Sequence, residues 1–474
     1  MNGRAAFAAV CGLALGLRAL RAATRWGHWP WLLAAAPGEH ARLWAEGRPW
    51  EALGLWMGLH GPLWPNAFGA LEAVAPVPAL WLAASAALAT AGVVALARVD
   101  RRAGLLLATA PVALHYAGEL NDYPLVLGMT GLAWAARTPA GAAAAALGAA
   151  WTHPLAGVGA AVALLRFGRA AAPAGLVLVL GALPLVPGAL ALLTDTGTAR
   201  QPSLDLARSA ADAARRFGPA PLLAVPLALV GLRHAPVAAL GLALPAALWA
   251  ALVAARVAAP HQFAPWTVWS APAALLVAAG LRSLGARAPR AAALTTLTLA
   301  LLGAGPGLLR DLRALTRIHT DAPRGIDLAL GALEVPDTCG PTLRPDCAGD
   351  ALLLIGPAGP NDDDKTTVSP SFYRLGPLAR LPRRFVDGED PRAPAAAAPR
   401  RFRGHVVYVD HDLRPSIVTI ASRHRRLVVV SMEPGRRPSF TTNLAAALGA
   451  PPQAVGPDLV FVVGAALPSH GETR

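Results

Sequence analysis

The sequence predicts an α-helical polytopic membrane protein of about eleven transmembrane helices, followed by a C-terminal extracytoplasmic α/β domain. Hydrophobic residues make up 55% of the 474-residue chain and charged residues only 15%, against about a quarter in soluble domains. Apolar runs alternate with Arg-rich turns up to about residue 310, after which the runs shorten to strand length. We therefore expect a transmembrane domain over residues 1–310 and a soluble domain over residues 311–474.

The basicity of the chain is carried almost entirely by arginine. It has 42 Lys and Arg residues against 28 Asp and Glu, a net charge of +14, and Lys365 is its single lysine. No stretch interleaves a basic patch with aromatic residues, as a nucleic-acid surface would. The expected partners are therefore membrane lipids, and no nucleic acid.

The first predicted span covers residues 5–20, and a long tryptophan-rich loop follows it. Arg18, Arg21 and Arg25 lie at and beyond the end of the apolar run, whereas a signal peptide, the alternative, carries its basic residues before the run. Residues 26–71 hold seven tryptophans, a residue enriched at the membrane–water boundary. Residues 39–59 have apolar side chains at helical spacing, so we expect an interfacial helix within an extracytoplasmic loop.

The arginine distribution predicts which side of the membrane each turn occupies. By the positive-inside rule, the turns at residues 98–102, 137, 166–169, 233 and 282–290 are cytoplasmic. The turns at residues 115–124, 153 and 260–262 are then outside, as is the C-terminal domain. The loop at residues 194–218 contains four arginines and breaks the rule, either as a ligand-facing surface or because the alternation slips there.

One polar turn separates two strongly apolar runs, at residues 103–114 and 125–136. It reads His115-Tyr116-Ala117-Gly118-Glu119-Leu120-Asn121-Asp122-Tyr123-Pro124. Ionisable groups at membrane depth are costly, so such residues are interpreted as functional by default. The alternative is a solvated hairpin loop.

The region after residue 310 contains short apolar runs bounded by Gly, Pro and Asp, which are typical of strands. Strands are predicted at residues 351–355, 405–409, 427–431 and 459–463, with helices at 416–423 and 442–448. The acidic loop at residues 361–365 could bind a cation or be a mobile loop, and residues 391–403 resemble a disordered insertion.

Cys339 and Cys347 lie in a Pro/Gly-rich loop of the domain placed outside. Close-spaced cysteines in an oxidising compartment usually pair, so a disulfide is expected. A metal site would need two further ligands, for which Asp346 and Asp350 are poor substitutes in a zinc centre.

Four segments together resemble the C-type glycosyltransferase superfamily, specifically bacterial relatives of protein O-mannosyltransferases and lipid A aminoarabinose transferases. Residues 13–18 resemble the end of that family's first helix, and Leu59-His60-Gly61-Pro62-Leu63-Trp64 resembles its His-Pro-Pro-Leu-Tyr segment. Residues 115–123 resemble its Tyr-Tyr-Ser-Gln-Glu-Ala-Arg-x-Tyr loop, and residues 151–157 its Thr-His-Tyr-x-Gly turn. The resemblance covers about residues 5–310 and implies transfer of a sugar from a polyprenyl-phosphate carrier on the outer face.

The resemblance also implies the site residues. The family's Asp-Glu pair after the first helix is represented only by Glu39 and His40, and its later arginines are replaced by Asn121 and by the segment containing Gln262. Sugar transfer needs a group to take the acceptor's proton and cations to bind the departing phosphate. The expected catalytic carboxylates are Glu39, Glu119 and Asp122. The expected substrate-binding residues are His40, Arg42, His60, Tyr116, Asn121, Tyr123, His153, His261 and Gln262.

Two questions stay open at this point. A divalent cation held by Glu39, Glu119 and His153 is conceivable, but no local spacing motif specifies one, and the sequence specifies no other cofactor. The alternative functions are a non-catalytic membrane scaffold or a lipid-linked substrate transporter that presents the C-terminal domain.

The predicted topology can be tested by labelling introduced cysteines. In a background lacking Cys11, Cys339 and Cys347, Gly168→Cys and Gly388→Cys should react with a membrane-impermeant maleimide from opposite sides, because the arginine distribution places residue 168 inside and residue 388 outside. Equal labelling of both positions in intact cells would contradict the layout.

Overall fold

The protein, described by a computed structural model, is mostly helical and divides into two compact units. Unit 1 comprises Met1–Arg25, Leu53–Trp64 and Ala79–His319, and unit 2 comprises Trp26–Ala52, Pro65–Pro78 and Thr320–Arg474. The predicted boundary at residue 310 falls inside a helix, α18. The structure describes residues 3–24, 29–30, 38–54, 61–74, 78–118, 120–188, 190, 217–254, 264–315, 325–336, 349–355, 367–368, 400–402, 405–410, 420–421, 424–431, 438–456 and 458–464.

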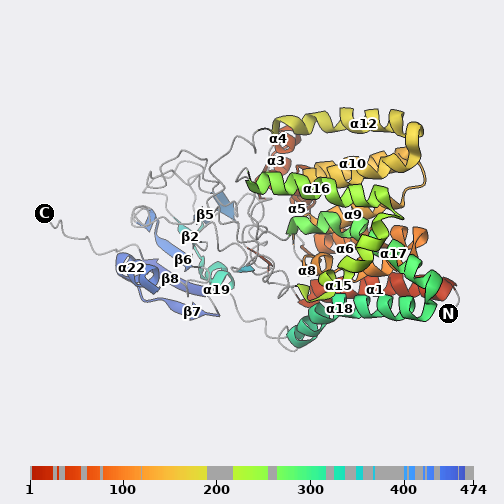
Figure 1. Cartoon of the computed structure of the whole chain (residues 1–474). Helices are drawn as coiled ribbons and strands as arrows, with labels where there is room; N and C mark the ends of the chain where they lie inside the picture. Colours follow the sequence, from red (N-terminus) through yellow and green to blue (C-terminus); the bar gives the residue numbers. More distant parts are fainter. Residues whose placement is uncertain are drawn as a thin grey trace. The chain divides into compact units, whose positions relative to one another are not determined.

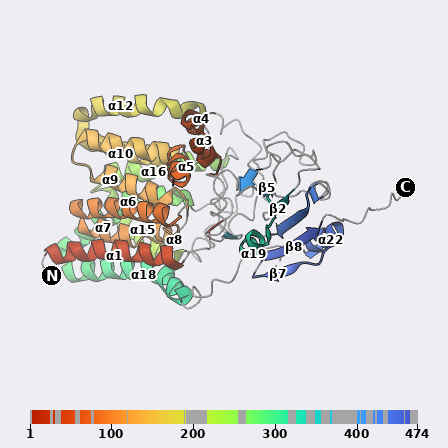
Figure 2. The same cartoon turned by 180° about the vertical axis from the view of Figure 1, so that it is seen from behind.

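Unit 1 is a bundle of helices that run side by side (Figures 1 and 2). Its longer helices are α1 (Gly3–Thr24), α6 (Pro78–Val99), α16 (Pro236–Ala254), α17 (Ser270–Arg287) and α18 (Pro289–Leu315). Its shorter elements are α7 (Arg101–Ala108), α8 (Pro111–His115), α9 (Tyr123–Ala135), α10 (Pro139–Thr152), α11 (Pro154–Ala161), η1 (Val162–Ala171), α12 (Ala172–Ala182), η2 (Leu183–Leu185), α15 (Ala220–Leu232) and η3 (Ala264–Trp269).

Six helices among the described residues are long and apolar enough to cross a membrane: Arg4–Thr24, Pro78–Val99, Pro154–Gly188, Pro236–Ala254, Trp266–Arg287 and Pro289–Arg313. The chain thus has the character of a helical membrane protein, but the predicted count of about eleven spans is wrong for the described part of the chain. Helices α9 and α15 have 13 residues each and extend about 20 Å at 1.5 Å per residue. The apolar layer of a bilayer is about 30 Å thick.

Proline and glycine break two segments that were expected to be continuous. The apolar run at residues 103–114 forms two short helices, because α7 ends at Ala108 and α8 begins at Pro111. Proline lacks the N–H that a position inside a helix needs. The helix expected at residues 39–59 is also divided, into α3 (Gly38–Ala45) and α4 (Pro49–Gly54). Between them Gly47 has a φ of 73°, a left-handed conformation that favours glycine.

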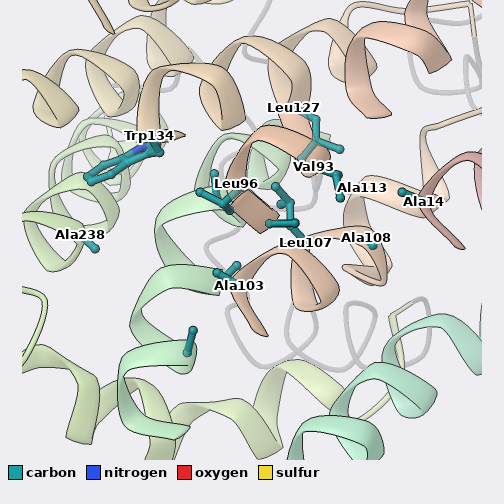
Figure 3. Close-up of a cluster of buried hydrophobic side chains, with 14 of the residues drawn as sticks. Ala14, Val93, Leu96, Ala103, Leu107, Ala108, Ala113, Leu127, Trp134 and Ala238 are labelled. Atoms are coloured by element: carbon teal, nitrogen blue, oxygen red, sulfur yellow. The ribbon is translucent and has the colours of Figure 1, made fainter. Parts of the chain in front are cut away.

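Small side chains allow the helices of unit 1 to pack closely. One buried apolar cluster joins several helices and includes Ala14, Val93, Leu96, Ala103, Leu107, Ala108, Ala113, Leu127, Trp134 and Ala238 (Figure 3). Where α15 packs against α17, a Cβ on Gly231 or Gly280 would clash with a backbone carbonyl of the opposite helix. Such small residues are typical of helix crossings in membranes.

Unit 2 contains a six-stranded mixed sheet with the order β4-β5-β2-β6-β8-β7. Strand β2 pairs in parallel with β5 and β6, and the outer strands β4, β8 and β7 pair antiparallel with their neighbours. The strands are β2 (Asp350–Ile355), β4 (Arg400–Phe402), β5 (His405–Asp410), β6 (Arg426–Ser431), β7 (Gln453–Val455) and β8 (Asp458–Gly464).

The four predicted strands are confirmed as β2, β5, β6 and β8. Strands β4 and β7 were not predicted, because each has only three residues and depends on pairing with a neighbour for its stability. β4 lies near the end of residues 391–403, the stretch predicted to be a disordered insertion. A second, two-stranded sheet pairs β1 (Trp29–Pro30) with β3 (Thr367–Val368).

Helices cover both faces of the larger sheet, which explains why every residue of β2 is buried. Leu444 and Leu448 of α22 (Pro438–Leu448) pack with the side chains that include Leu353 and Leu427 on one face. On the other face, Gly325 at the start of α19 (Gly325–Ala332) lies close to Val430. Central parallel strands read as continuous apolar runs because both of their faces are covered.

Asp350, at the start of β2, forms hydrogen bonds with the backbone of residues 334 and 335. Its Oδ2 accepts hydrogen bonds from the backbone N–H groups of Glu334 (2.8 Å) and Val335 (3.0 Å) and from the Arg426 guanidinium (3.0 Å). Burial acts to raise the pKa of Asp350, but these three donors outweigh it, so the pKa lies below its ordinary value. The charged form therefore stabilises the folded state of the sheet.

Asp350→Asn should lower the free energy of unfolding by about 1–3 kcal/mol at neutral pH, because the buried donors lose a charged acceptor. The loss should shrink as pH falls below about 4, the ordinary pKa of an aspartate, because the wild-type carboxylate is then also protonated. Denaturant titration of the full chain in detergent at several pH values measures this difference. Glu334→Gln, whose side chain is 62% exposed, is the matched control and should change little. A pH-independent difference for Asp350→Asn would contradict the argument.

Candidate functional site

The polar turn between α8 and α9 is built by proline and asparagine. Pro124 occupies the first turn of α9, where its missing N–H is not needed. The Asn121 Oδ1 accepts a hydrogen bond from the Tyr123 N–H at 3.1 Å, a local bond that fixes the entry to the helix. Asn121 and Asp122 are fully buried, and Tyr123 is nearly so. This turn therefore carries a carboxyl group into the interior of unit 1.

His153 forms the junction between α10 and α11 and is fully buried. Its backbone is extended, because α10 ends at Thr152 and Pro154 begins the next helix. The His153 N–H donates to the Ala149 carbonyl at 2.8 Å, and its carbonyl accepts from Ala156 at 2.9 Å. The imidazole is thus attached to a rigid corner of the backbone.

Three of the four family-like segments meet around these two turns. The Gly61 N–H donates to the Thr152 carbonyl at 2.8 Å, and a Cβ on Gly61 would clash with the Trp151 carbonyl. The rings of Tyr123 and His153 are 6.2 Å apart, centroid to centroid. The segment at residues 151–157 therefore contacts both of the others, through Gly61 and through Tyr123.

The fourth family-like segment lies in α1, and Arg21, three residues beyond its end, contacts the polar turn. Gly118 packs so closely on α1 that a Cβ would lie 2.5 Å from the Arg21 carbonyl oxygen. The Arg21 guanidinium donates to the His115 carbonyl at 3.2 and 3.3 Å and pairs with Asp311 of α18 at 2.5 Å. One turn earlier, Arg18 is fully buried and donates to the Ala14 carbonyl at 2.9 Å.

Aromatic rings connect the two buried turns to η3. In order along the series, neighbouring centroids are 5.7, 6.4, 5.8, 4.9, 5.2 and 6.2 Å apart, and the rings are Trp269, Trp266, Phe217, His115, Tyr116, Tyr123 and His153. Phe217, Trp266 and Trp269 were not among the predicted site residues. The tryptophans following His261 and Gln262 were a usable signal, whereas Phe217 belongs to no distinguishing sequence motif.

Three predicted site residues belong to unit 2. Glu39, His40 and Arg42 lie in α3, which packs with α4 and α5 (Leu63–Val74). The Trp44 Nε1–H donates to Asn66 Oδ1 at 3.0 Å, and Asn66 in turn donates to the Ala52 carbonyl at 3.1 Å. His40 is fully buried. The helices α3, α4 and α5 are therefore joined by side-chain hydrogen bonds.

Other predicted residues cannot be placed. Six predicted residues lie outside the described residues: His60, Glu119, His261, Gln262, Cys339 and Cys347. The roles of the first four and the disulfide between the two cysteines therefore stay predictions. Within the described ranges, no group of three His, Cys, Asp or Glu side chains is arranged to hold a metal ion. The only carboxylate among the predicted catalytic residues that the structure describes in unit 1 is Asp122.

Comparisons with known proteins supply no family assignment. No protein-family model matches the chain, and no curated protein matches it.

The contact between residue 61 and the 151–153 corner can be tested with Gly61→Ala. The added methyl group would meet the Trp151 carbonyl, so we expect a loss of about 1–3 kcal/mol of stability. The apparent melting temperature in detergent measures it. Gly16→Ala, where a Cβ meets nothing within 4 Å, is the control and should be neutral or slightly stabilising. Equal melting temperatures for the two variants would contradict the close packing.

Proposed function

We propose that this protein is a membrane glycosyltransferase that moves a sugar from a polyprenyl-phosphate carrier to a lipid, glycan or protein acceptor on the outer face of the membrane. The observation that carries the proposal is the convergence of the family-like segments. Residues 59–64, 115–123 and 151–157 resemble separate functional loops of one enzyme family, and in unit 1 the last of these contacts the other two, through Gly61 and Tyr123. Three unrelated local resemblances would have no reason to come into contact.

The chemistry needs a base, an acceptor site and a place for the departing phosphate. The acceptor oxygen attacks the anomeric carbon, the bond from that carbon to the phosphate oxygen breaks, and a base takes the acceptor's proton. On the resemblance, we assign the base to Glu39, in the position of the family's acidic pair. Within unit 1, Asp122 is the carboxylate that would bind and orient an acceptor hydroxyl. His153 and the Tyr116 and Tyr123 rings would form the wall against which the sugar lies.

The proposal includes a location. The predicted topology places the turn at residues 115–124 and unit 2 on the extracytoplasmic side of the plasma membrane, where lipid-linked sugars are used by enzymes of this class. Asp122 and His153 lie at the ends of helices, whereas a transporter needs its polar groups in broken helices near the middle of the membrane. A non-catalytic scaffold would have no use for the buried Asp122 and His153 in two neighbouring turns.

Transfer should depend strongly on Glu39. We expect Glu39→Gln to reduce turnover of a polyprenyl-phosphate sugar by about 10²–10⁴-fold, the usual contribution of general base catalysis. Binding of the carrier should stay largely intact, since it depends on cations. Release of polyprenyl phosphate from the purified full chain in nanodiscs measures turnover.

Two further variants complete the comparison. Asp122→Asn should reduce turnover less than Glu39→Gln, because it orients rather than deprotonates. Glu46→Gln is the matched control from the same loop, since Glu46 pairs with Arg48 at the surface, and should retain wild-type turnover. Wild-type turnover by Glu39→Gln would remove Glu39 as the base, and no turnover by the wild-type chain with any lipid-linked sugar would favour the scaffold.

A further inference from the structure

A pocket lies among α1, α8 and α18 in unit 1. Only about 20 Å³ of it is enclosed space for a water-sized group, and the remainder is a recess open to its surroundings. Leu17, Leu20, Leu114, Phe217 and Leu308 contribute apolar walls, and small residues of α18 form another side. Helices α1 and α18 are both long and apolar enough to cross a membrane.

The charged groups of the pocket leave one positive charge without a carboxylate partner. Two guanidinium groups, Arg21 and Arg310, and one carboxylate, Asp311, line it, which gives a net charge of +1 when His115 is neutral. Arg21 is bound to Asp311 and to the His115 carbonyl. Among the described residues, Arg310 contacts no carboxylate, and its Nη2 lies 3.5 Å from the His115 Nδ1. Arg310 is therefore the cation available to a ligand.

Glycine keeps part of this space open. Gly307 lines the pocket, and a Cβ added there would meet no atom within 4 Å. Pro306 stands beside it inside α18 and removes one backbone N–H from the helix ladder. Any larger residue at position 307 would place its side chain in the open volume.

We propose that this pocket binds the phosphate group of a membrane lipid, with Arg310 contacting the phosphate and the leucine-lined walls receiving the start of the acyl or prenyl chain. Arginine is well suited to phosphate because its guanidinium makes paired, charge-assisted hydrogen bonds. Basic pockets between membrane helices are known to hold anionic lipid head groups. The inference goes beyond the proposed transfer reaction, since it requires only a lipid phosphate.

The test is lipid binding to the purified full chain, measured by native mass spectrometry with phosphatidylglycerol as the probe. We expect one retained lipid in the wild type. Arg310→Gln should weaken binding by about tenfold or more, through loss of a charge-assisted bond, and Gly307→Leu should abolish it by filling the pocket. Arg313→Gln and Gly305→Leu are the matched controls. They lie on the same helix outside the pocket lining, and a Cβ at residue 305 also meets open space, so both should bind within twofold of wild type.

Further arms identify the lipid. Phosphatidylcholine, whose phosphate charge is balanced, should bind at least tenfold more weakly than phosphatidylglycerol. A polyprenyl phosphate that binds more tightly than phosphatidylglycerol would support the pocket and identify the carrier as its ligand, whereas the reverse order would support it as a site for a structural phospholipid. Inorganic phosphate that binds as tightly as either lipid would overturn the lipid assignment.

Equal binding by the wild type, Arg310→Gln and Gly307→Leu would overturn the proposal. That outcome is separable from failure of the transfer reaction. Lipid retention lost in these two variants, without turnover in the wild type, would leave the pocket in place and remove the transferase. Turnover without any effect of the two variants on lipid retention would do the opposite.

Discussion

The ion pair between Arg21 and Asp311 connects the first and the last helix of unit 1. Both side chains are less than a tenth exposed, at 6% and 8%, so water compensates neither charge. Removal of one partner from a buried pair costs about 3–5 kcal/mol, because the other charge is left uncompensated. The Arg21 guanidinium also donates a hydrogen bond to the His115 carbonyl, and Gly118 packs against the Arg21 backbone. The polar turn after α8 therefore depends on this pair.

Backbone hydrogen bonding explains why polar residues gather at helix ends. Among apolar helices, every unpaired N–H and C=O needs a partner from the protein. Prolines lie in the first turns of α8, α9 and α11, and at the breaks the free groups are taken up by Asn121, by the His153 backbone and by the Gly61 N–H. At the other end of α9, Arg166 donates to the last carbonyls of the helix, at 3.0 Å to Ala133 and 3.3 Å to Ala136.

His115 joins the region proposed for sugar transfer to the proposed lipid pocket. Its ring packs edge to face on Tyr116 at 4.9 Å and on Phe217 at 5.8 Å, while its Nδ1 faces Arg310. A ligand with a phosphate near Arg310 would place the adjoining atoms along the aromatic series. The charge and the aromatic surface are thus contiguous. In a lipid-linked sugar, the phosphate and the sugar are likewise adjacent.

The sequence by itself determined the class of the protein, the four main strands and the polar turns. These follow from local pattern: apolar runs, β-branched runs between Gly and Pro, and ionisable residues where an apolar run stops. It did not determine the number of helices long enough to cross a membrane, because a proline such as Pro111 divides an apolar run without changing its hydropathy. Only the tertiary structure decided that Gly61 lies on the Thr152 carbonyl, that Phe217 stands between His115 and Trp266, and that Asp311 neutralises Arg21. Each of those contacts joins residues far apart in the chain, and side-chain spacing within a single segment carries no information about them.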